Sequence, residues 1–395
     1  MRILERKIGS LIAAANIHEK KVTYGIAIAK SNSDPSLSVS YTDDAVNFIP
    51  SSGNNGSFID NGWKNRFPFN KIKPCLLKNG ALQYYLNLND FTKKMNGTES
   101  DITSGADGDV MIEFPKIWYS ITQDNNFIYV RYSNTEQIGF TDWGMSYKGV
   151  VKEKFYIGAY FGSDVDGKLC SLSGKTPINS LTIGNMRLKA QTKGNGYEQL
   201  SWNKLIMLQI LYLVRFKNLD SQTALGNGYT LGSSMTNTGA TDNKGMNYGD
   251  TIGSQIKFCG IEDFWGNLFQ LVDGFVFNAD GTGNIVRGNI AISDGNYNDT
   301  AAGYSLEKSG AASINGGISA VMGTNKLGFT IAGSSGSSNT YFCDYGHLLN
   351  TGSFKFPVFG GNYVTKALGG VFYLRAFWGA ADSATAVSGR LIYCG

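Results

Sequence analysis

The sequence predicts an α+β protein that is mostly β, built from short strands and two helices. Charged residues make up 17% of the 395 residues, aromatic residues 13% and hydrophobic residues 42%. Because soluble proteins average roughly 25% charged residues, Asn, Ser, Thr and Gly must supply much of the polar surface. Fifty glycines against seven prolines favour turns between short strands over long charged helices. This composition is typical of a loop-rich extracellular or virion protein.

The N-terminal residues 1–21 predict a docking or oligomerisation helix, because their apolar side chains recur on one side of a helix. These residues are Ile3, Leu4, Ile8, Leu11, Ile12 and Ala15. The alternative is a short signal peptide cleaved near Ala13 or Ala15. Glu5 interrupts its basic region, and the apolar run is barely long enough for that role. The helix is preferred.

Strands are expected to follow at 23–30 and 36–42, on either side of a turn rich in Asn, Ser, Asp and Pro. Asn79-Gly80 predicts a tight hairpin turn, since Asn-Gly tolerates the positive φ angles that such turns need. Further short strands are expected within 109–121 and 125–133.

Two later segments depart from the β pattern. Residues 197–219 are apolar on nearly all sides and predict a core helix that is N-capped near Ser201. Lysines and arginines interrupt this segment, which argues against a membrane span. Residues 260–275 predict a shorter helix or a tight turn, and beyond them we expect strands and glycine loops.

Charge and cysteine usage exclude several classes of protein. The net charge is +4 and no basic run occurs, so nucleic-acid binding is not expected. No apolar run reaches the roughly 18 residues of a membrane span, so membrane insertion is not expected either. The five cysteines are far apart, without zinc-ligand spacing, and are predicted to be buried, reduced thiols of a protein made in a cytosol.

Motifs for cofactors are incomplete. The phosphate-loop-like SGKTP at 173–177 lacks the required glycine, because Leu169 occupies that position. Two segments, at 293–299 and 278–284, resemble the start of a calcium loop, but the twelfth positions are Ser305 and Asn289 instead of glutamate. Structural turns are preferred, so no cofactor is expected, with calcium as a weak alternative.

Catalytic arrangements are also unconvincing. His347 could serve a Ser/His/Asp or Cys/His centre, but no family signature surrounds it. Glu262 and Asp263 could be paired carboxylates, but adjacent residues on a helix point away from each other. The chain is therefore not expected to be an enzyme.

The C-terminal segment 354–395 is the strongest functional signal. It combines glycine turns with large, dissimilar side chains, many of them Tyr, Trp, Phe and Arg. Tyr, Trp and Arg dominate the hot spots of recognition surfaces. The segment therefore predicts a binding surface on a rigid scaffold.

Four blocks taken together resemble the C-type-lectin-like domain of phage tail and receptor-binding proteins, including tropism determinants diversified by retroelements. They are residues 155–177, 187–228, 260–275 and 360–391. The opening at 23–48 is similar to the start of phage-encoded proteins of this type. Formylglycine-generating enzymes share the fold, and their G-N-V-W-E-W element is echoed at 265–270. Their catalytic cysteines have no counterpart here, so oxidoreductase activity is a second alternative that the motifs do not favour.

The resemblance implies that residues 1–45 form an attachment and oligomerisation segment and that 46–150 form a β-rich region. Residues 151–395 would form the lectin-like domain, with a ligand-binding segment at 345–395. Its framework would be Gly360, Gly361, Gly369, Gly370, Phe372, Gly389, Arg390 and Leu391. The outward-facing, ligand-binding set would be Tyr345, His347, Phe354, Tyr363, Thr365, Lys366, Tyr373, Arg375, Phe377, Trp378 and Asp382.

The resemblance further implies a phage tail-fibre or baseplate adhesin at the tail tip of the virion, made in the cytoplasm of the bacterial host. Its partners would be a bacterial surface receptor, protein or glycan, and other tail proteins, and it would form a homotrimer. The alternative is a structural tail component whose aromatics pack a core or an interface between subunits.

Overall fold

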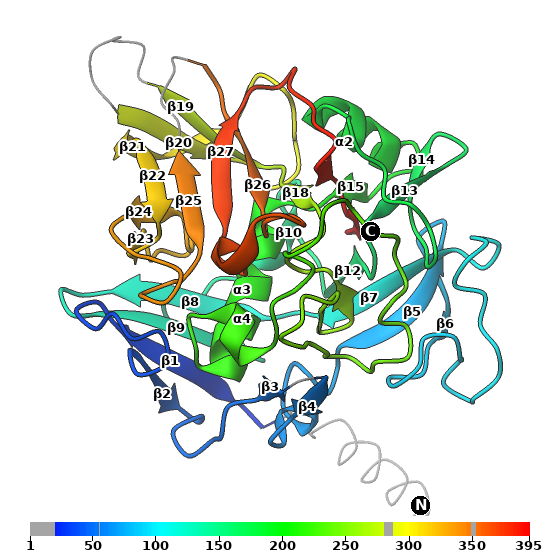
Figure 1. Ribbon diagram of the computed structural model, residues 1–395, viewed down its shortest axis with the longest axis horizontal. Coiled ribbons are helices and arrows are strands. Elements are labelled where there is room, and N and C mark those ends of the chain that lie inside the picture. Colours follow the sequence, from blue (N-terminus) through cyan, green and yellow to red (C-terminus); the bar gives the residue numbers. More distant parts are fainter. Residues whose placement is uncertain (1–19, 55, 280–286, 349–352) are drawn as a thin grey trace, which may run out of the picture.

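The computed structural model describes residues 20–54, 56–279, 287–348 and 353–395. Short strands dominate these residues, with few helices between them (Figure 1). The predicted α+β, mostly-β class is therefore confirmed. The predicted N-terminal helix lies outside the described residues. No helix among them is long and apolar enough to cross a membrane.

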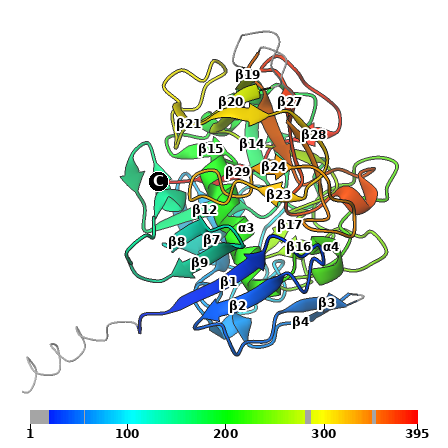
Figure 2. The same cartoon turned by 90° about the vertical axis from the view of Figure 1, so that its left-hand side faces the viewer.

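The first strands belong to a four-stranded antiparallel sheet. Its order is β2 (Val39–Asp43), β1 (Thr23–Ala29), β9 (Phe127–Ser133) and β8 (Trp118–Gln123). Both predicted N-terminal strands are thus confirmed. This sheet lies toward the bottom in Figures 1 and 2.

A six-stranded sheet takes the last strand of the chain into its interior. Its order is β15 (Tyr197–Gln199), β29 (Leu391–Tyr393), β12 (Lys154–Gly158), β7 (Asp109–Pro115), β5 (Lys73–Lys78) and β6 (Ala81–Tyr85). The predicted hairpin joins β5 to β6, with φ of 52° at Asn79 and 77° at Gly80. Both angles are positive, which explains the Asn-Gly pair.

A second six-stranded sheet contains the strands of the C-terminal segment other than β29. Its order is β22 (Ile314–Gly317), β25 (Tyr345–Leu348), β27 (Leu374–Trp378), β26 (Phe356–Phe359), β18 (Phe269–Leu271) and β28 (Val387–Ser388). β27 lies inside this sheet, parallel to β25 and antiparallel to β26. In Figures 1 and 2 it lies toward the top, away from β1 and β2.

Smaller sheets fill the connections. The three-stranded sheet has the order β19 (Phe275–Ala279), β20 (Arg287–Ile292) and β21 (Ser305–Ala312). The two-stranded pairs are β3 (Ser52–Asn54) with β4 (Ser57–Ile59), β10 (Ser146–Tyr147) with β11 (Val150–Val151), β13 (Gly162–Val165) with β14 (Lys168–Ser171), β16 (Lys257–Phe258) with β17 (Ile261–Glu262), and β23 (Ala320–Val321) with β24 (Ile331–Gly333).

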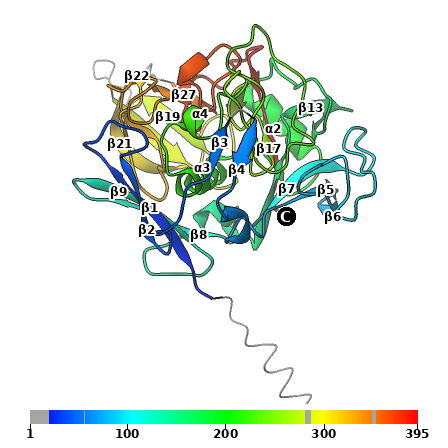
Figure 3. The same cartoon turned by 60° about the horizontal axis from the view of Figure 1, so that its bottom comes forward.

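The described helices are α2 (Ile183–Gln191), α3 (Trp202–Phe216) and α4 (Ser221–Ala224), and the 3₁₀ turns are Trp63–Asn65, Trp143–Met145 and Lys366–Leu368. α3 is the predicted core helix. It begins after Ser201, as predicted, but the Ser201 side chain makes no capping hydrogen bond. The helix ends at Phe216, and the next residue, Lys217, has a left-handed φ of 50°. Every residue of α3 is buried, and the helix lies in the centre of the molecule (Figure 3).

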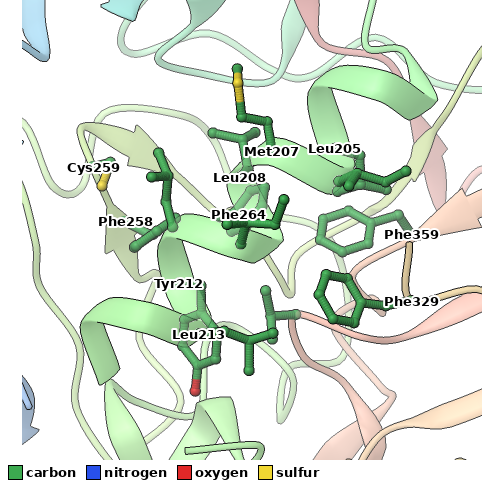
Figure 4. Close-up of a cluster of buried hydrophobic side chains, with 14 of the residues drawn as sticks. Leu205, Met207, Leu208, Tyr212, Leu213, Phe258, Cys259, Phe264, Phe329 and Phe359 are labelled. Carbon is green, nitrogen blue, oxygen red and sulfur yellow. The ribbon is translucent and has the colours of Figure 1, made fainter. Parts of the chain in front are cut away.

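Aromatic and aliphatic side chains surround α3 on several sides. Tyr212 and Leu208 of α3 lie in one buried cluster with Phe258, Phe264 and Phe359, which come from strands and loops (Figure 4). A helix that is apolar all round is stable only when it is enclosed in this way. The core is therefore built around α3, and the sheets close around it.

The sequence predicts a short helix or a tight turn for residues 260–275, and the tight turn is confirmed. The segment is not a helix; it forms tight turns between β17, β18 and β19. Asp263, Gly266 and Asn267 have positive φ angles of 49°, 86° and 61°, which a helix does not allow. The backbone at Gly266 also passes so close to Tyr229 that an added Cβ would lie 2.7 Å from its nitrogen.

The division at residues 45 and 150 stays a prediction. Within the described residues, the four-stranded sheet joins β1 and β2 to β8 and β9, and so crosses residue 45. The sheet that contains β7 and β12 crosses residue 150. One buried hydrophobic cluster runs from Tyr24 to Cys394.

One buried arginine joins the two six-stranded sheets. Arg390 is 0% exposed and lies between β28, in one sheet, and β29, in the other. Its guanidinium donates to Gln270 Oε1 (2.8 Å) and to the carbonyl oxygens of Gly158 (3.0 Å), Glu262 (2.8 Å) and Asp263 (3.2 Å). This side chain therefore ties the end of the chain to three separate loops and strands.

We predict that Arg390→Met lowers the free energy of unfolding by roughly 3–5 kcal/mol, because it leaves buried acceptors without donors. Arg131→Met is the matched control. Arg131 is partly exposed and has one ion pair, with Asp43 (3.0 Å), so its loss should cost less than about 1 kcal/mol. Urea unfolding measures the free energy of unfolding of both variants. Equal midpoints for the two variants would contradict the role given to Arg390.

Candidate ligand-binding surface

Residues of β25 and β27 share one face of the second six-stranded sheet. The parallel register pairs His347 with Arg375 and Leu348 with Ala376. Leu348 and Ala376 are buried, whereas His347 and Arg375 are half-buried on the opposite face. Side chains alternate along a strand, so Tyr345 and Phe377, two positions from His347 and Arg375, lie on the same face. These four residues and Trp378 form what we call the aromatic–arginine cluster.

The cluster is held together by ring contacts. The guanidinium carbon of Arg375 lies 4.0 Å from the ring centroid of Phe377, a cation–π distance. The His347 ring stacks on Phe377 with centroids 5.5 Å apart and planes at 10°. Trp378 lies 5.0 Å from Phe377. Phe377 is therefore the centre of the cluster.

A buried aromatic layer supports the cluster. Tyr373 stacks on Phe269 at 5.3 Å, and the edge of Trp378 meets Phe269 at 6.3 Å. Tyr373 is only 2% exposed, which corrects the expectation that its side chain faces outward. It precedes β27 and packs beneath Tyr345, at 6.0 Å. Its position supports the exposed rings.

The segment leading into β27 is fixed by a buried carboxyl group. Asp344, next to β25, accepts a hydrogen bond from the backbone nitrogen of Phe372 (2.7 Å). Gly370 passes so close that an added Cβ would lie 2.3 Å from Asp344 Oδ1. Burial raises the pKa of Asp344 well above its ordinary value. All eight predicted framework residues are buried, as a rigid support requires.

Arg375 lacks the carboxylate partner that Arg131, Arg187 and Arg215 have. In the described part of the chain it forms no ion pair; its Nη1 makes a 3.5 Å contact with the Tyr373 hydroxyl and its Nε has no partner. Arg131, which lies over Tyr129 at 5.3 Å, is by contrast paired with Asp43. The cluster thus presents an uncompensated positive charge beside aromatic rings.

His347 is the titratable neighbour of that charge. Burial, and then the positive charge of Arg375, hold the pKa of His347 below its ordinary value. Its Nδ1 is buried without a hydrogen-bond partner among the described residues. The imidazole is therefore neutral near pH 7 and does not add a second charge.

The remaining predicted residues do not join the cluster. Tyr363, Thr365 and Lys366 lie in the loop between β26 and β27; the backbone nitrogen of Lys366 donates to Thr230 (3.0 Å) and its carbonyl accepts from Gln222 (2.8 Å). This loop is thereby held against α4 and the segment around residue 230.

The last two predicted residues, Asp382 and Phe354, also lie outside the cluster. Asp382 is exposed and accepts a hydrogen bond from the backbone of Gly379 (2.7 Å). Phe354 packs, half-buried, against the second hydrophobic cluster. The structure therefore brings together Tyr345, His347, Arg375, Phe377 and Trp378, with Tyr373 beneath them.

Two contributors were not predicted. Phe269 of β18 lies under the cluster, and its place in the WGNLFQ motif was the available signal. Asn315 of β22 pairs with His347 across the sheet, and its side-chain oxygen accepts a hydrogen bond from the Tyr345 hydroxyl. Asn315 precedes the cluster by 30 residues or more, so no local pattern could have assigned it.

The two candidate catalytic carboxyl groups are enclosed. Glu262 and Asp263 are each 1% exposed. Glu262 accepts from the backbone nitrogens of Gly239 (2.7 Å) and Thr241 (2.8 Å), and Asp263 from Gln255 (2.6 Å). Burial raises the pKa of both carboxyl groups. Their hydrogen bonds hold loops together.

The five cysteines are unpaired and buried, as predicted. Burial raises the pKa of every one of these thiols. Among the described residues no group of three His, Cys, Asp or Glu side chains could hold a metal ion.

We predict that the stability of the protein falls as the pH drops from 7 to 5, in part through His347. The fold favours the neutral imidazole, so the stabilisation is complete above the unfolded-state pKa of about 6.5 and is lost as the pH falls through it toward the lower folded-state pKa. In a His18→Gln background, NMR should show His347 titrating below 6.5, and Arg375→Gln should move it upward. Titration at or above 6.5 would contradict the arrangement.

Comparison with known proteins finds solved structures that are similar to this chain. No protein-family model matches the chain, and no curated protein matches it. The I1, M1 and P3c variants of the Major Tropism Determinant are similar in structure, with 10%, 10% and 11% identity and TM-scores of 0.31, 0.32 and 0.30. The match covers 94% of this chain and 71–72% of theirs. These three structures are tropism determinants, which are among the proteins that the sequence motifs resemble. This likeness gives no residue correspondences, so the function rests on the geometry of the cluster.

Proposed function

We propose that this protein is a receptor-binding protein of a phage tail, an adhesin that recognises the bacterial host surface without enzymatic activity. The observation that carries the proposal is the aromatic–arginine cluster. It combines half-exposed rings with an arginine that has no ion-pair partner among the described residues. Aromatic and arginine side chains are the usual anchors of a recognition surface.

Rigid support makes the cluster suitable for binding. Its rings lie on the interior strand β27 and on β25, and Tyr373 and Phe269 pack beneath them. Side chains that are held before binding lose little conformational entropy when a ligand arrives. The cluster can therefore give useful affinity from a small area.

The proposed adhesin would assemble as a homotrimer. A homotrimer at the tail tip would present three clusters to one cell, and avidity would multiply a modest affinity. The protein would be made in the host cytoplasm, where its five free cysteines would stay reduced. Residues 1–45 would attach it to other tail proteins.

A structural tail component is the second candidate. Phe377 and Trp378 are half-buried within one chain, and a neighbouring subunit could cover the remaining ring surface. In that case substitution of Phe377 or Trp378 by alanine would prevent particle assembly, while the isolated subunits would remain folded.

We predict that Phe377→Ala or Trp378→Ala reduces adsorption to host cells by at least tenfold for each anchor, since an anchor is worth roughly 2 kcal/mol or more. The matched control is Tyr129→Ala. Tyr129 also lies half-buried under an arginine, but on β9, in the sheet away from β27. Phage adsorption with thermal melting of the purified protein measures the effect and checks folding.

Adsorption that survives both cluster substitutions would contradict the adhesin proposal. Particles that fail to assemble, from subunits that melt normally, would favour the structural candidate. Equal loss in Tyr129→Ala would show that the effect is not specific to the cluster.

A thiol titration tests the oxidoreductase alternative. Because all five cysteines are buried and burial raises their pKa, we expect fewer than one thiol to react in the native protein and five after denaturation. A native thiol that reacts rapidly would favour redox chemistry over the adhesin proposal.

A further inference from the structure

We propose that the ligand of the aromatic–arginine cluster is a carboxylated saccharide, whose carboxylate binds Arg375 while its ring packs on Phe377 and Trp378. The inference rests on the proposed function, because it takes the cluster to be the receptor-binding surface. It adds the chemical class of the ligand, which the proposed function leaves open between protein and glycan.

The charge of the cluster indicates an anion. Arg187 forms an ion pair with Asp273 at 2.8 Å, and Arg215 forms one with Asp60 at 2.5 Å. Arg375 has no such partner among the described residues, and its neighbour His347 is neutral near pH 7. The acid nearest in the sequence before it, Asp344, is buried and turned to the backbone of Phe372. An external carboxylate would supply the missing partner.

The chemistry of the guanidinium favours a planar acid. The guanidinium carbon of Arg375 lies 4.0 Å from the ring centroid of Phe377, and the N–H donors of a guanidinium lie in its own plane. A carboxylate can accept two of these donors side by side, in a charge-assisted pair. Nη1 has only a long contact, with the Tyr373 hydroxyl at 3.5 Å, which a carboxylate oxygen can displace.

The neighbouring rings favour a saccharide over an acidic peptide. Phe377 and Trp378 lie 5.0 Å apart and inclined at 45°, and their remaining surface can contact the apolar C–H face of a pyranose ring. β27 is hydrogen-bonded on both sides, to β25 and β26. A peptide therefore cannot add as a strand at this position, which removes the main-chain hydrogen bonds of that binding mode.

Polar groups for saccharide hydroxyls lie beside the rings. Asn315 is exposed and pairs with His347 across the sheet, and its side chain is bonded to the Tyr345 hydroxyl. The amide and the phenol together offer donors and acceptors next to the charged site. The cluster thus supplies an anion partner, an apolar platform and a polar edge.

The test uses purified, full-length protein and an array of oligosaccharides that contain uronate, nonulosonate or octulosonate residues. Each saccharide stands beside its carboxyl-reduced, neutral form. Phosphorylated saccharides and a pentaglutamate peptide are included as other anions. We expect a carboxylated saccharide to bind at least tenfold more tightly than its reduced form. Arg375→Gln should remove this preference, and Arg131→Gln, the paired surface arginine, should keep it.

Arg375→Lys separates charge from geometry: it should retain part of the affinity and lose most of the tenfold preference, since an ammonium cannot pair bidentately. Thermal melting confirms that each variant is folded. Equal binding of acid and reduced forms, preference for the phosphorylated saccharides or the peptide, or no binding at all would overturn the inference. So would a preference that persists in Arg375→Gln.

The two proposals fail in different ways. If Trp378→Ala abolishes adsorption but the array shows no preference for carboxylates, the adhesin function stands and the saccharide inference fails. If a carboxylated saccharide binds through Arg375 but adsorption is unchanged in Trp378→Ala, the inference stands and the adhesin function fails. Protease treatment of the cells adds a further check, because adsorption to a saccharide should survive it.

Discussion

The buried guanidinium of Arg390 is the interaction on which the C-terminal structure depends. Enclosing a charge in a protein core is costly unless donors and acceptors are fully matched, and here Gln270 and three backbone carbonyls accept its hydrogen bonds. Burial lowers the pKa of Arg390 to about 10, and the nearby Asp263 and Glu262 oppose this shift. Arg390 therefore remains charged near neutral pH and holds its partners in one arrangement.

That arrangement decides where the binding surface lies. β28 pairs in parallel with β18 in one six-stranded sheet, and β29 enters the other beside β12. Arg390 lies between β28 and β29 and bonds to residues near both sheets. With the end of the chain fixed in this way, β18 places Phe269 beneath Tyr373 and Trp378. The rigidity of the cluster thus depends on the buried hydrogen bonds of Arg390, which lie some distance from it.

The cluster itself combines two opposing physical requirements. Its rings must be packed well enough to stay in place, and Phe377 meets this need through His347 on one face and Arg375 nearby. They must also keep surface for a ligand, which half-burial allows. Among the described residues, Arg375 has neither a carboxylate partner nor a set of backbone acceptors such as Arg390 has, and this is the reason for assigning the surface to recognition. The same reasoning applied to Arg131, which has its partner, assigns no function there.

The sequence by itself determined the elements whose signals are local. The Asn79-Gly80 turn, the apolar helix α3 and the first two strands follow from φ preferences, periodicity and composition. The buried framework of the C-terminal segment is what the family resemblance implies. Only the tertiary structure decided what depends on contacts between distant residues. It turned 260–275 into strands and turns, added α2, and buried Tyr373 against Phe269. It also separated Lys366 from Arg375, although the two residues are only nine positions apart. The reason is physical: strand register and sheet order bring residues together from all parts of the chain, and no local pattern encodes which strand a given residue will face.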